Sequence, residues 1–180
     1  MPGGVPAPIT AMRENRRRNH LTLETDTMAH NPVNHPLRPM YRLLAFVAGA
    51  YLVLFGIVGL IQTAGVNFAG QSDVRVLGQG SSLLWSIICL ILGGVVLLTT
   101  VVGRNLDVDA DKFIGWGLLV VGSYELATNR TDANLFGFTM PTVIVTYLIG
   151  LVLITAGLYT KIAPPQETGA PRQVREGRTA

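Results

Sequence analysis

The chain is poor in charge and nearly free of cysteine. Only 14% of its 180 residues are charged, against about 25% in an ordinary soluble domain. The single cysteine, Cys89, excludes an internal disulfide framework and any site built from several cysteines. Because Cys89 lies within a hydrophobic run, we expect it to pack as a small apolar residue. The composition indicates an integral membrane protein rather than a soluble one.

Groups that carry enzymatic chemistry are also scarce. The three histidines, His20, His30 and His35, stand at no metal-ligand spacing, and no nucleophile, base and orienting group come together along the chain. A net charge of +3 would suggest nucleic acid as a partner of a soluble protein, but most basic residues here flank hydrophobic runs. We therefore expect no enzymatic activity, no cofactor, no metal and no nucleic-acid partner.

Four hydrophobic runs dominate what is present. Residues 43–61 contain no charged side chain, and a helix of that length crosses the ~30 Å hydrocarbon layer of a bilayer at ~1.5 Å per residue. The sequence therefore predicts an all-α integral membrane protein with four transmembrane helices in a left-handed bundle, over a domain of residues 41–163. The predicted spans are about 41–64, 83–102, 113–128 and 142–161.

The third run is short, since only 12 uncharged residues separate Lys112 from Glu125, and such a stretch can be re-entrant. The distribution of basic residues favours four spans. With four spans, twelve basic residues face one side and only Arg75 and Arg130 face the other, so the positive-inside rule puts both tails in the cytoplasm. The twelve are Arg13, Arg16, Arg17, Arg18, Arg38, Arg42, Arg104, Lys112, Lys161, Arg172, Arg175 and Arg178.

Both ends of the chain lack apolar periodicity. Residues 1–40 are basic and rich in proline, and residues 164–180 are polar, so we predict a disordered cytoplasmic tail on each side of the membrane domain. Met28 begins a stretch that would make a natural translation start. We hypothesise that translation starts at Met28 rather than Met1, which the intact mass of the native protein distinguishes.

Small residues recur at a seven-residue spacing on every run. In lipid no hydrophobic drive brings helices together, so small residues mark the faces where helix backbones approach. A seven-residue spacing keeps one such face toward a neighbouring helix. We expect Leu54 and Val96, which lie off these faces, to contact lipid. The predicted packing residues are Gly49, Gly56, Ser86, Gly93, Gly115, Gly122, Gly150 and Gly157.

Glu125 is the only ionisable side chain inside a predicted span, and such residues are candidates for function. It shares a helix stripe with Gly115, Leu118 and Gly122, which predicts that its carboxylate points toward the packed interior. Glu125 also lies about one turn from the end of its span, so its side chain could reach the water at the membrane surface instead. Of these two arrangements we expect the exposed carboxylate.

Two polar segments are interpreted as helix starts. Asp107, Asp109 and Asp111 alternate as at the start of a calcium-binding loop, but the glycine and glutamate that this motif requires are absent. The acids suit the N-terminus of the third span, where negative charge favours the helix dipole. Residues 78–81, GQGS, lack the lysine of a phosphate loop, and we interpret them as a turn and cap before the second span.

Three segments of the sequence are similar to segments of a known membrane-protein family. They are GAYLVLFGIVGLIQTAG in the first span, NLFGF at 134–138, and ITAGLYTK at the end of the fourth span. In these segments the chain resembles an actinobacterial family of four-helix membrane proteins known as a domain of unknown function, over about residues 41–161. Members of that family often carry histidines in the second and fourth spans, where this chain has none. The resemblance implies a bacterial plasma membrane and no assigned activity.

Two functions from different classes remain open. The leading hypothesis is a non-enzymatic accessory or scaffold protein that packs against itself or against a larger membrane complex. The alternative is a small carrier or channel that uses Glu125 as an intramembrane carboxylate. A quinone-dependent redox enzyme has the least support, because no histidine or cysteine pair could ligate a metal or haem.

Overall fold

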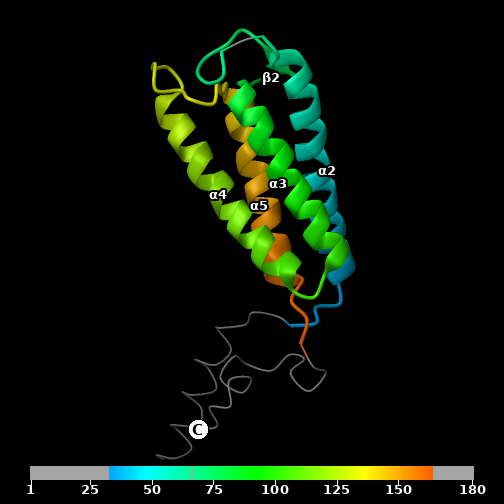
Figure 1. Cartoon of the computed structure of the whole chain (residues 1–180). Helices are drawn as coiled ribbons and strands as arrows, with labels where there is room; N and C mark the ends of the chain where they lie inside the picture. The colour runs from blue at the N-terminus through cyan, green and yellow to red at the C-terminus, as the bar shows by residue number, and fades with distance from the viewer. Residues whose placement is uncertain (1–32, 66, 164–180) are drawn as a thin grey trace, which may run out of the picture.

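The computed structural model describes residues 33–65 and 67–163, and this part of the chain is helical. It contains α2 (Arg38–Thr63), α3 (Leu83–Val102), α4 (Leu106–Thr128) and α5 (Met140–Tyr159). A small antiparallel hairpin of β1 (Arg75–Val76) and β2 (Gln79–Gly80) lies between α2 and α3. The helices run alternately up and down, with both long loops at one end and the described termini at the other (Figure 1). We call these the loop end and the terminal end.

Three of the described helices, α2, α3 and α5, are long and apolar enough to cross a membrane. This confirms the prediction of a helical protein with membrane-spanning segments at the level of length and composition. Helix α4 is less apolar because it carries Asp107, Asp109, Asp111, Lys112 and Glu125. That α4 is a fourth span, and that both tails are cytoplasmic, stay predictions.

Helix α4 is longer than the span predicted at 113–128. It begins at Leu106, because the acidic segment before Lys112 is helical rather than part of a loop. The turn between α3 and α4 is correspondingly short. Gly103, Arg104 and Asn105 all have positive φ, at 67°, 57° and 66°, and these left-handed residues reverse the chain within three positions.

Short polar side chains start the helices at the loop end. The Ser82 hydroxyl accepts a hydrogen bond from the Trp85 backbone N–H at 3.2 Å and caps α3. Thr139 and Thr142 form a capping box at the start of α5. The predicted turn at 78–81 lies in the β1–β2 hairpin, whereas the cap itself is one residue further along the chain.

Two asparagines fasten the terminal end. Asn105 Oδ1 accepts from the Ile162 N–H at 2.7 Å, and Asn105 Nδ2 donates to the Ile162 carbonyl at 3.0 Å. Asn34 makes the same pair of bonds with Ala163, at 3.2 and 2.7 Å. The predicted N-terminal tail is therefore structured from Val33 onward. Residues 1–32 and 164–180, with the choice between two start methionines, lie outside the described residues.

In the first helical hairpin, glycines bring α2 and α3 into backbone contact. A Cβ added at Gly93 would lie 2.7 Å from the Gly49 carbonyl oxygen, and one added at Gly56 would lie 2.7 Å from the Leu90 backbone nitrogen. No side chain fits within such distances. The two helix backbones can therefore approach this closely only because these positions lack a side chain.

The second hairpin, α4 with α5, is built in the same way. A Cβ added at Gly115 would lie 2.8 Å from the Gly150 carbonyl oxygen, and one added at Gly157 would lie 2.8 Å from the Val108 carbonyl oxygen. Gly122 differs, because a Cβ there would meet the Tyr147 ring at 3.5 Å, which is an ordinary contact. Gly122 therefore has room for a methyl group.

Two further positions depart from the seven-residue pattern. Ser86, which the pattern selects, packs its hydroxyl against Gly59, which the pattern passes over. Val96 was expected to face lipid, and this is wrong: it is 0% exposed and lies over Gly49. The reason is that Val96 fills the space that Gly49 leaves. Leu54 is 53% exposed on the outer surface, as expected.

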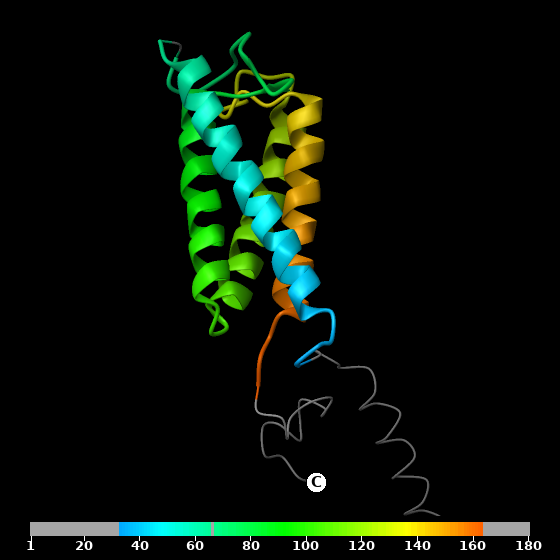
Figure 2. The same cartoon turned by 90° about the vertical axis from the view of Figure 1, so that its right-hand side faces the viewer.

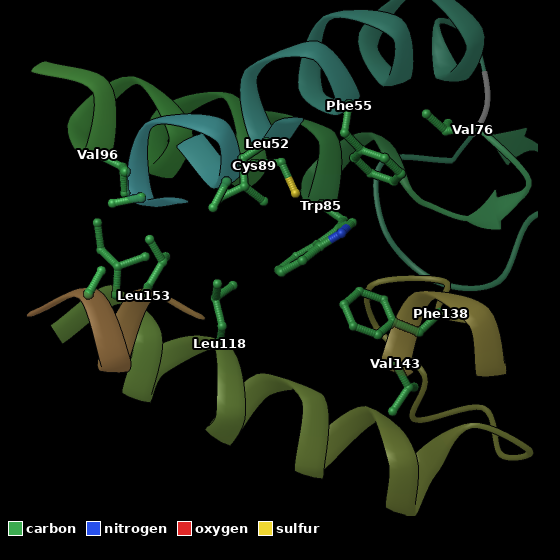
Figure 3. Packing of buried hydrophobic residues seen from close by; sticks show 14 residues of the cluster. Leu52, Phe55, Val76, Trp85, Cys89, Val96, Leu118, Phe138, Val143 and Leu153 are labelled. Carbon is green, nitrogen blue, oxygen red and sulfur yellow. The ribbon is translucent and has the colours of Figure 1, made fainter. Parts of the chain in front are cut away.

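The two hairpins share one hydrophobic core. Leu52, Cys89 and Val96 from the first hairpin face Leu118 and Leu153 from the second (Figure 3), and all five are at most 3% exposed. Cys89 is thus a buried apolar core residue, as expected. Helix α2 is inclined to the other helices as it crosses the bundle (Figure 2).

The close contacts within the hairpins give a first prediction. Gly93→Ala and Gly115→Ala should each lower the thermal midpoint in detergent, because the new methyl group meets backbone atoms that cannot move aside; overpacking of this kind costs about 1–3 kcal/mol. Gly94→Ala and Gly117→Ala are matched controls, since a Cβ at either position meets nothing within 4 Å. The controls should keep or slightly raise the midpoint, because alanine favours helix. Equal midpoints for all four variants would remove the backbone-contact assignment.

Candidate functional site

Glu125 lies near the loop end of α4 and is completely buried, at 0% exposed. Its predicted orientation toward the interior is confirmed, since Gly115, Leu118 and Gly122 on the same stripe are buried with it. The expected exposed carboxylate is wrong. The loop after α4 folds back over the helix end, and Glu125 Oε1 accepts a hydrogen bond from the Phe136 backbone N–H at 3.2 Å. Oε2 has no hydrogen-bond partner.

The segment that covers Glu125 is 134–138, NLFGF. Asn134 holds it in a tight loop, because its Oδ1 accepts from the Phe138 N–H and its Nδ2 donates to the Phe138 carbonyl, both at 2.9 Å. Gly137 has φ 69°, and a Cβ there would lie 2.8 Å from the Gly70 carbonyl oxygen. Local bonding and a required glycine thus fix the backbone that reaches Glu125.

This loop is also joined to the loop between α2 and α3. The Trp85 ring packs against the rings of Phe136 and Phe138, with centroids 5.5 and 4.7 Å apart. The Ser82 N–H donates to the Phe136 carbonyl at 2.9 Å, and the Gly70 N–H donates to the Leu135 carbonyl at 2.7 Å. We call Trp85, Phe136 and Phe138 the aromatic lid. The lid closes the loop end of the bundle over Glu125.

A second acidic site lies at the terminal end, where sequence reasoning found only a helix start. Asp107 and Asp111 stand one turn apart on α4 and are each 1% exposed. Arg42 Nε lies 3.5 Å from Asp107 Oδ2, and Arg42 Nη2 donates to the Thr100 carbonyl. Among the described residues, none of the four carboxylate oxygens of the two aspartates has a hydrogen-bond partner. The available signal was the four-residue spacing, which puts both acids on one helix face.

The three aspartates therefore differ in role. Asp109 is exposed and lies in the first turn of α4, so it matches the predicted helix-start role. Asp111 precedes the predicted span 113–128 and faces inward. Burial raises the pKa of Asp111 to about 7, and the nearby Asp107 carboxylate also raises it. Neither buried acid makes a capping bond, and the N-cap position is Asn105.

The interior between these two acidic sites is apolar. Ile114 and Leu118 continue the inward face of α4 from Asp111 toward Glu125, and both are at most 5% exposed. Leu118 and Leu153 both point from the second hairpin toward Leu52, Cys89 and Val96 of the first (Figure 3). A small cavity beside Leu118 holds about 10 Å³, which is room for about one water molecule. Hydrophobic packing therefore separates Asp111 from Glu125.

Metal-ligating residues do not cluster in the described ranges. Within 33–65 and 67–163, no group of three or more His, Cys, Asp or Glu side chains could hold a metal ion. His35 packs its ring against Tyr41 and Tyr159, with centroids 5.9 and 5.4 Å apart. His20 and His30 lie outside the described residues.

The bond between Glu125 and the loop gives a second prediction. Glu125→Ala should lower the thermal midpoint and speed proteolysis at 129–139, because it leaves the part-buried Phe136 N–H without its acceptor; such a loss costs about 1–3 kcal/mol when the group is fully buried, and less here. Glu125→Gln keeps a carbonyl oxygen at the same place, so it should retain most of the stability and the protection of the loop. Equal proteolysis of the wild type and Glu125→Ala would show that Glu125 does not hold the loop.

The comparisons with known proteins leave the resemblance over 41–161 as a prediction. No family model, no curated protein and no solved structure matches this chain.

Proposed function

We propose that the protein is a non-enzymatic accessory or scaffold protein of a bacterial plasma membrane, with four spans in a left-handed bundle and both tails in the cytoplasm. Two observations support the fourth span. Helix α4 has 23 residues, about 35 Å at ~1.5 Å per residue. Helix α4 also packs closely along α5, which is apolar enough to cross a membrane, so the two helices would lie at the same depth in the bilayer. The twelve-to-two distribution of basic residues supports the orientation.

The observation that carries the functional proposal is the closed interior. The aromatic lid covers the loop end, and Ile114, Leu118 and Leu153 fill the space between the two acidic sites. A carrier or channel needs a polar path or a binding cavity inside the bundle, whereas the cavity beside Leu118, which Tyr51, Gln79 and Thr146 help to line, holds only about 10 Å³. The outer surface is therefore the part of the molecule that can act on a partner.

That outer surface has an apolar groove between α2 and α5. The groove encloses about 290 Å³, enough for two or three leucine-sized side chains. Ala48 is a buried floor residue, while Val47 and Leu148 are exposed on the rims. Its lining residues are Leu44, Val47, Ala48, Tyr51, Val145, Leu148, Ile149 and Val152.

The occupant that we propose for the groove is a second copy of this chain. A two-fold interface uses the same surface of both copies, so the rim of one copy can pack into the groove of the other, and the reverse. Here the exposed Leu148 rim borders a groove floored by Ala48, and ridges of this size pack into grooves at helix crossings. A pair of copies would then bury the apolar face of α2 and α5 against protein instead of lipid.

The alternative, a carrier or channel that uses Glu125, has less support. Glu125 Oε1 is occupied by the Phe136 N–H, so the carboxylate holds the loop that closes the bundle. The apolar segment between Asp111 and Glu125 also separates it from the terminal end. We therefore assign Glu125 a structural role.

Cross-linking in native membranes tests the scaffold proposal. On a Cys89→Ala background, Leu148→Cys and Val47→Cys should form adducts of twice the chain mass with a short bifunctional maleimide. Val120→Cys is the matched control, because it is 66% exposed on α4, away from the groove. A fixed adduct with a different protein would show that the groove binds a subunit of a larger complex rather than a second copy of this chain. Equal adducts at all three positions, or none, would contradict the proposed groove contact.

The orientation has a separate test. In intact cells lacking Cys89, a membrane-impermeant maleimide should label Ala133→Cys in the α4–α5 loop and spare Arg104→Cys in the α3–α4 turn, because the positive-inside rule puts these loops on opposite sides. Both positions are exposed on the surface of the protein, and both should react after detergent is added. Labelling of position 104 in intact cells would show that the α3–α4 turn lies outside, and the proposed orientation would then be wrong.

A further inference from the structure

The acidic site at the terminal end is not balanced in charge. Two carboxylates, Asp107 and Asp111, are buried here, and only Asp107 forms an ion pair with Arg42. Neither α3 nor α5 contains a charged residue. On α2 the other cation, Arg38, donates to the Thr160 carbonyl at 2.9 Å. Within residues 33–65 and 67–163, the Asp111 carboxylate therefore has no ion-pair partner.

On α4 itself the remaining charged groups point elsewhere. Asp109 is exposed. Lys112 directs its stem toward α5, where its Cγ would meet a Cβ added at Gly157 at 2.8 Å. An isolated buried charge is costly enough that such a group usually becomes neutral instead. The site therefore requires one added positive charge.

A polar side chain outside the acidic pair also lacks a partner here. The Thr100 hydroxyl on α3 is buried and makes no hydrogen bond within the part of the chain that the structure describes, although the Thr100 carbonyl accepts from Arg42. Other helix threonines behave differently: the hydroxyls of Thr63, Thr99 and Thr155 each donate to the carbonyl four residues earlier. Thr100 thus keeps a free hydroxyl in the buried region that contains Arg42 and Asp107.

We propose that Asp107, Asp111 and Thr100 form a binding site for one exchangeable proton at the terminal end of the bundle, with Arg42 as its fixed counter-charge. In the bound form Asp111 is a neutral carboxylic acid, and Asp107 stays ionised beside Arg42. A hydroxyl such as that of Thr100 can accept from the acid or donate to the carboxylate. On release, the Asp111 O–H bond breaks, the proton goes to water, and the buried site gains one negative charge.

The released form must bring water to Asp111. Asp111 is buried one turn from Asp107, which pairs with Arg42 of the other hairpin, so hydration would loosen the contact between the two hairpins at this end. The site would therefore couple proton concentration on the terminal side to the packing of α4. This inference concerns a different face from the α2–α5 groove and does not depend on self-association.

The sign of the pH dependence follows from the raised pKa of Asp111. Because that pKa rises from 3.8 in the free side chain to about 7, the folded protein holds the proton more tightly than the unfolded chain does. The contribution to stability is complete below pH ~4 and is lost as pH rises toward ~7. Over that window the unfolding equilibrium constant should grow by up to about tenfold per pH unit.

Infrared difference spectroscopy of the full chain in lipid nanodiscs tests the proposal directly. The wild type should show a protonated carboxyl band that disappears as pH rises through about 7. Asp111→Asn should lack this band, and Asp109→Asn, an exposed acid two residues away, should keep it. A carboxyl that titrates near the free value, or a band that survives in Asp111→Asn, would overturn the proton site. So would titration that shifts when sodium replaces choline at constant ionic strength, because the ligand would then be a metal cation.

Stability across pH gives a second readout that does not depend on band assignment. Asp111→Asn is neutral and nearly the same shape, so it should fold and lose the decline in thermal midpoint between pH ~4 and ~7 that the wild type and Asp109→Asn show. Thr100→Val removes the hydroxyl without changing charge and should move the midpoint of the carboxyl titration. An unchanged titration in Thr100→Val would remove Thr100 from the site, and equal pH profiles for Asp111→Asn and the wild type would overturn it altogether.

Discussion

The contact of bare helix backbones at glycine is the constraint on which the bundle depends. At Gly93 and Gly115 a single carbon atom would already meet backbone atoms of the neighbouring helix. If the bundle lies in lipid, as proposed, such contacts are the main source of helix association, since hydrophobic burial between helices contributes little there. These contacts produce two tight hairpins. Both the hydrophobic core and the α2–α5 groove lie where the two hairpins meet.

The two hairpins are less closely packed against each other than their own helices are, and hydrogen bonds at the ends of the bundle add to the connection, from Ser82 to Phe136 at the loop end and between Asn34 and Ala163 at the terminal end. Three asparagines act alike, each bonding both the N–H and the carbonyl of one backbone residue: Asn34 with Ala163, Asn105 with Ile162 and Asn134 with Phe138. Side-chain amides can replace a backbone partner in this way where no helix or strand supplies one. The loops are therefore structural parts of the fold.

The buried acidic side chains at the two ends of the bundle differ in their hydrogen bonding. Glu125 accepts a hydrogen bond from a backbone N–H of the loop that it supports, so its carboxyl group serves the closure of the lid. Within the described residues Asp111 receives no hydrogen bond, and the one nearby ion pair joins Arg42 to Asp107. A hydrogen bond to a carboxylate stabilises its charged form, whereas burial without one favours the neutral form. Chemistry is therefore expected at the aspartates and structure at the glutamate.

The sequence by itself determined the helical segments, the apolar composition of three of them and the inward stripe that carries Glu125. These depend on hydrophobic length and helix periodicity, which are local properties of the chain. Only the tertiary structure decided that a loop covers Glu125, that Val96 fills the space over Gly49, and that Asp107 and Asp111 face inward near Arg42. The physical reason is that burial of a side chain depends on which distant segment returns to it, and spacing along one helix fixes the face of a residue but not what lies opposite.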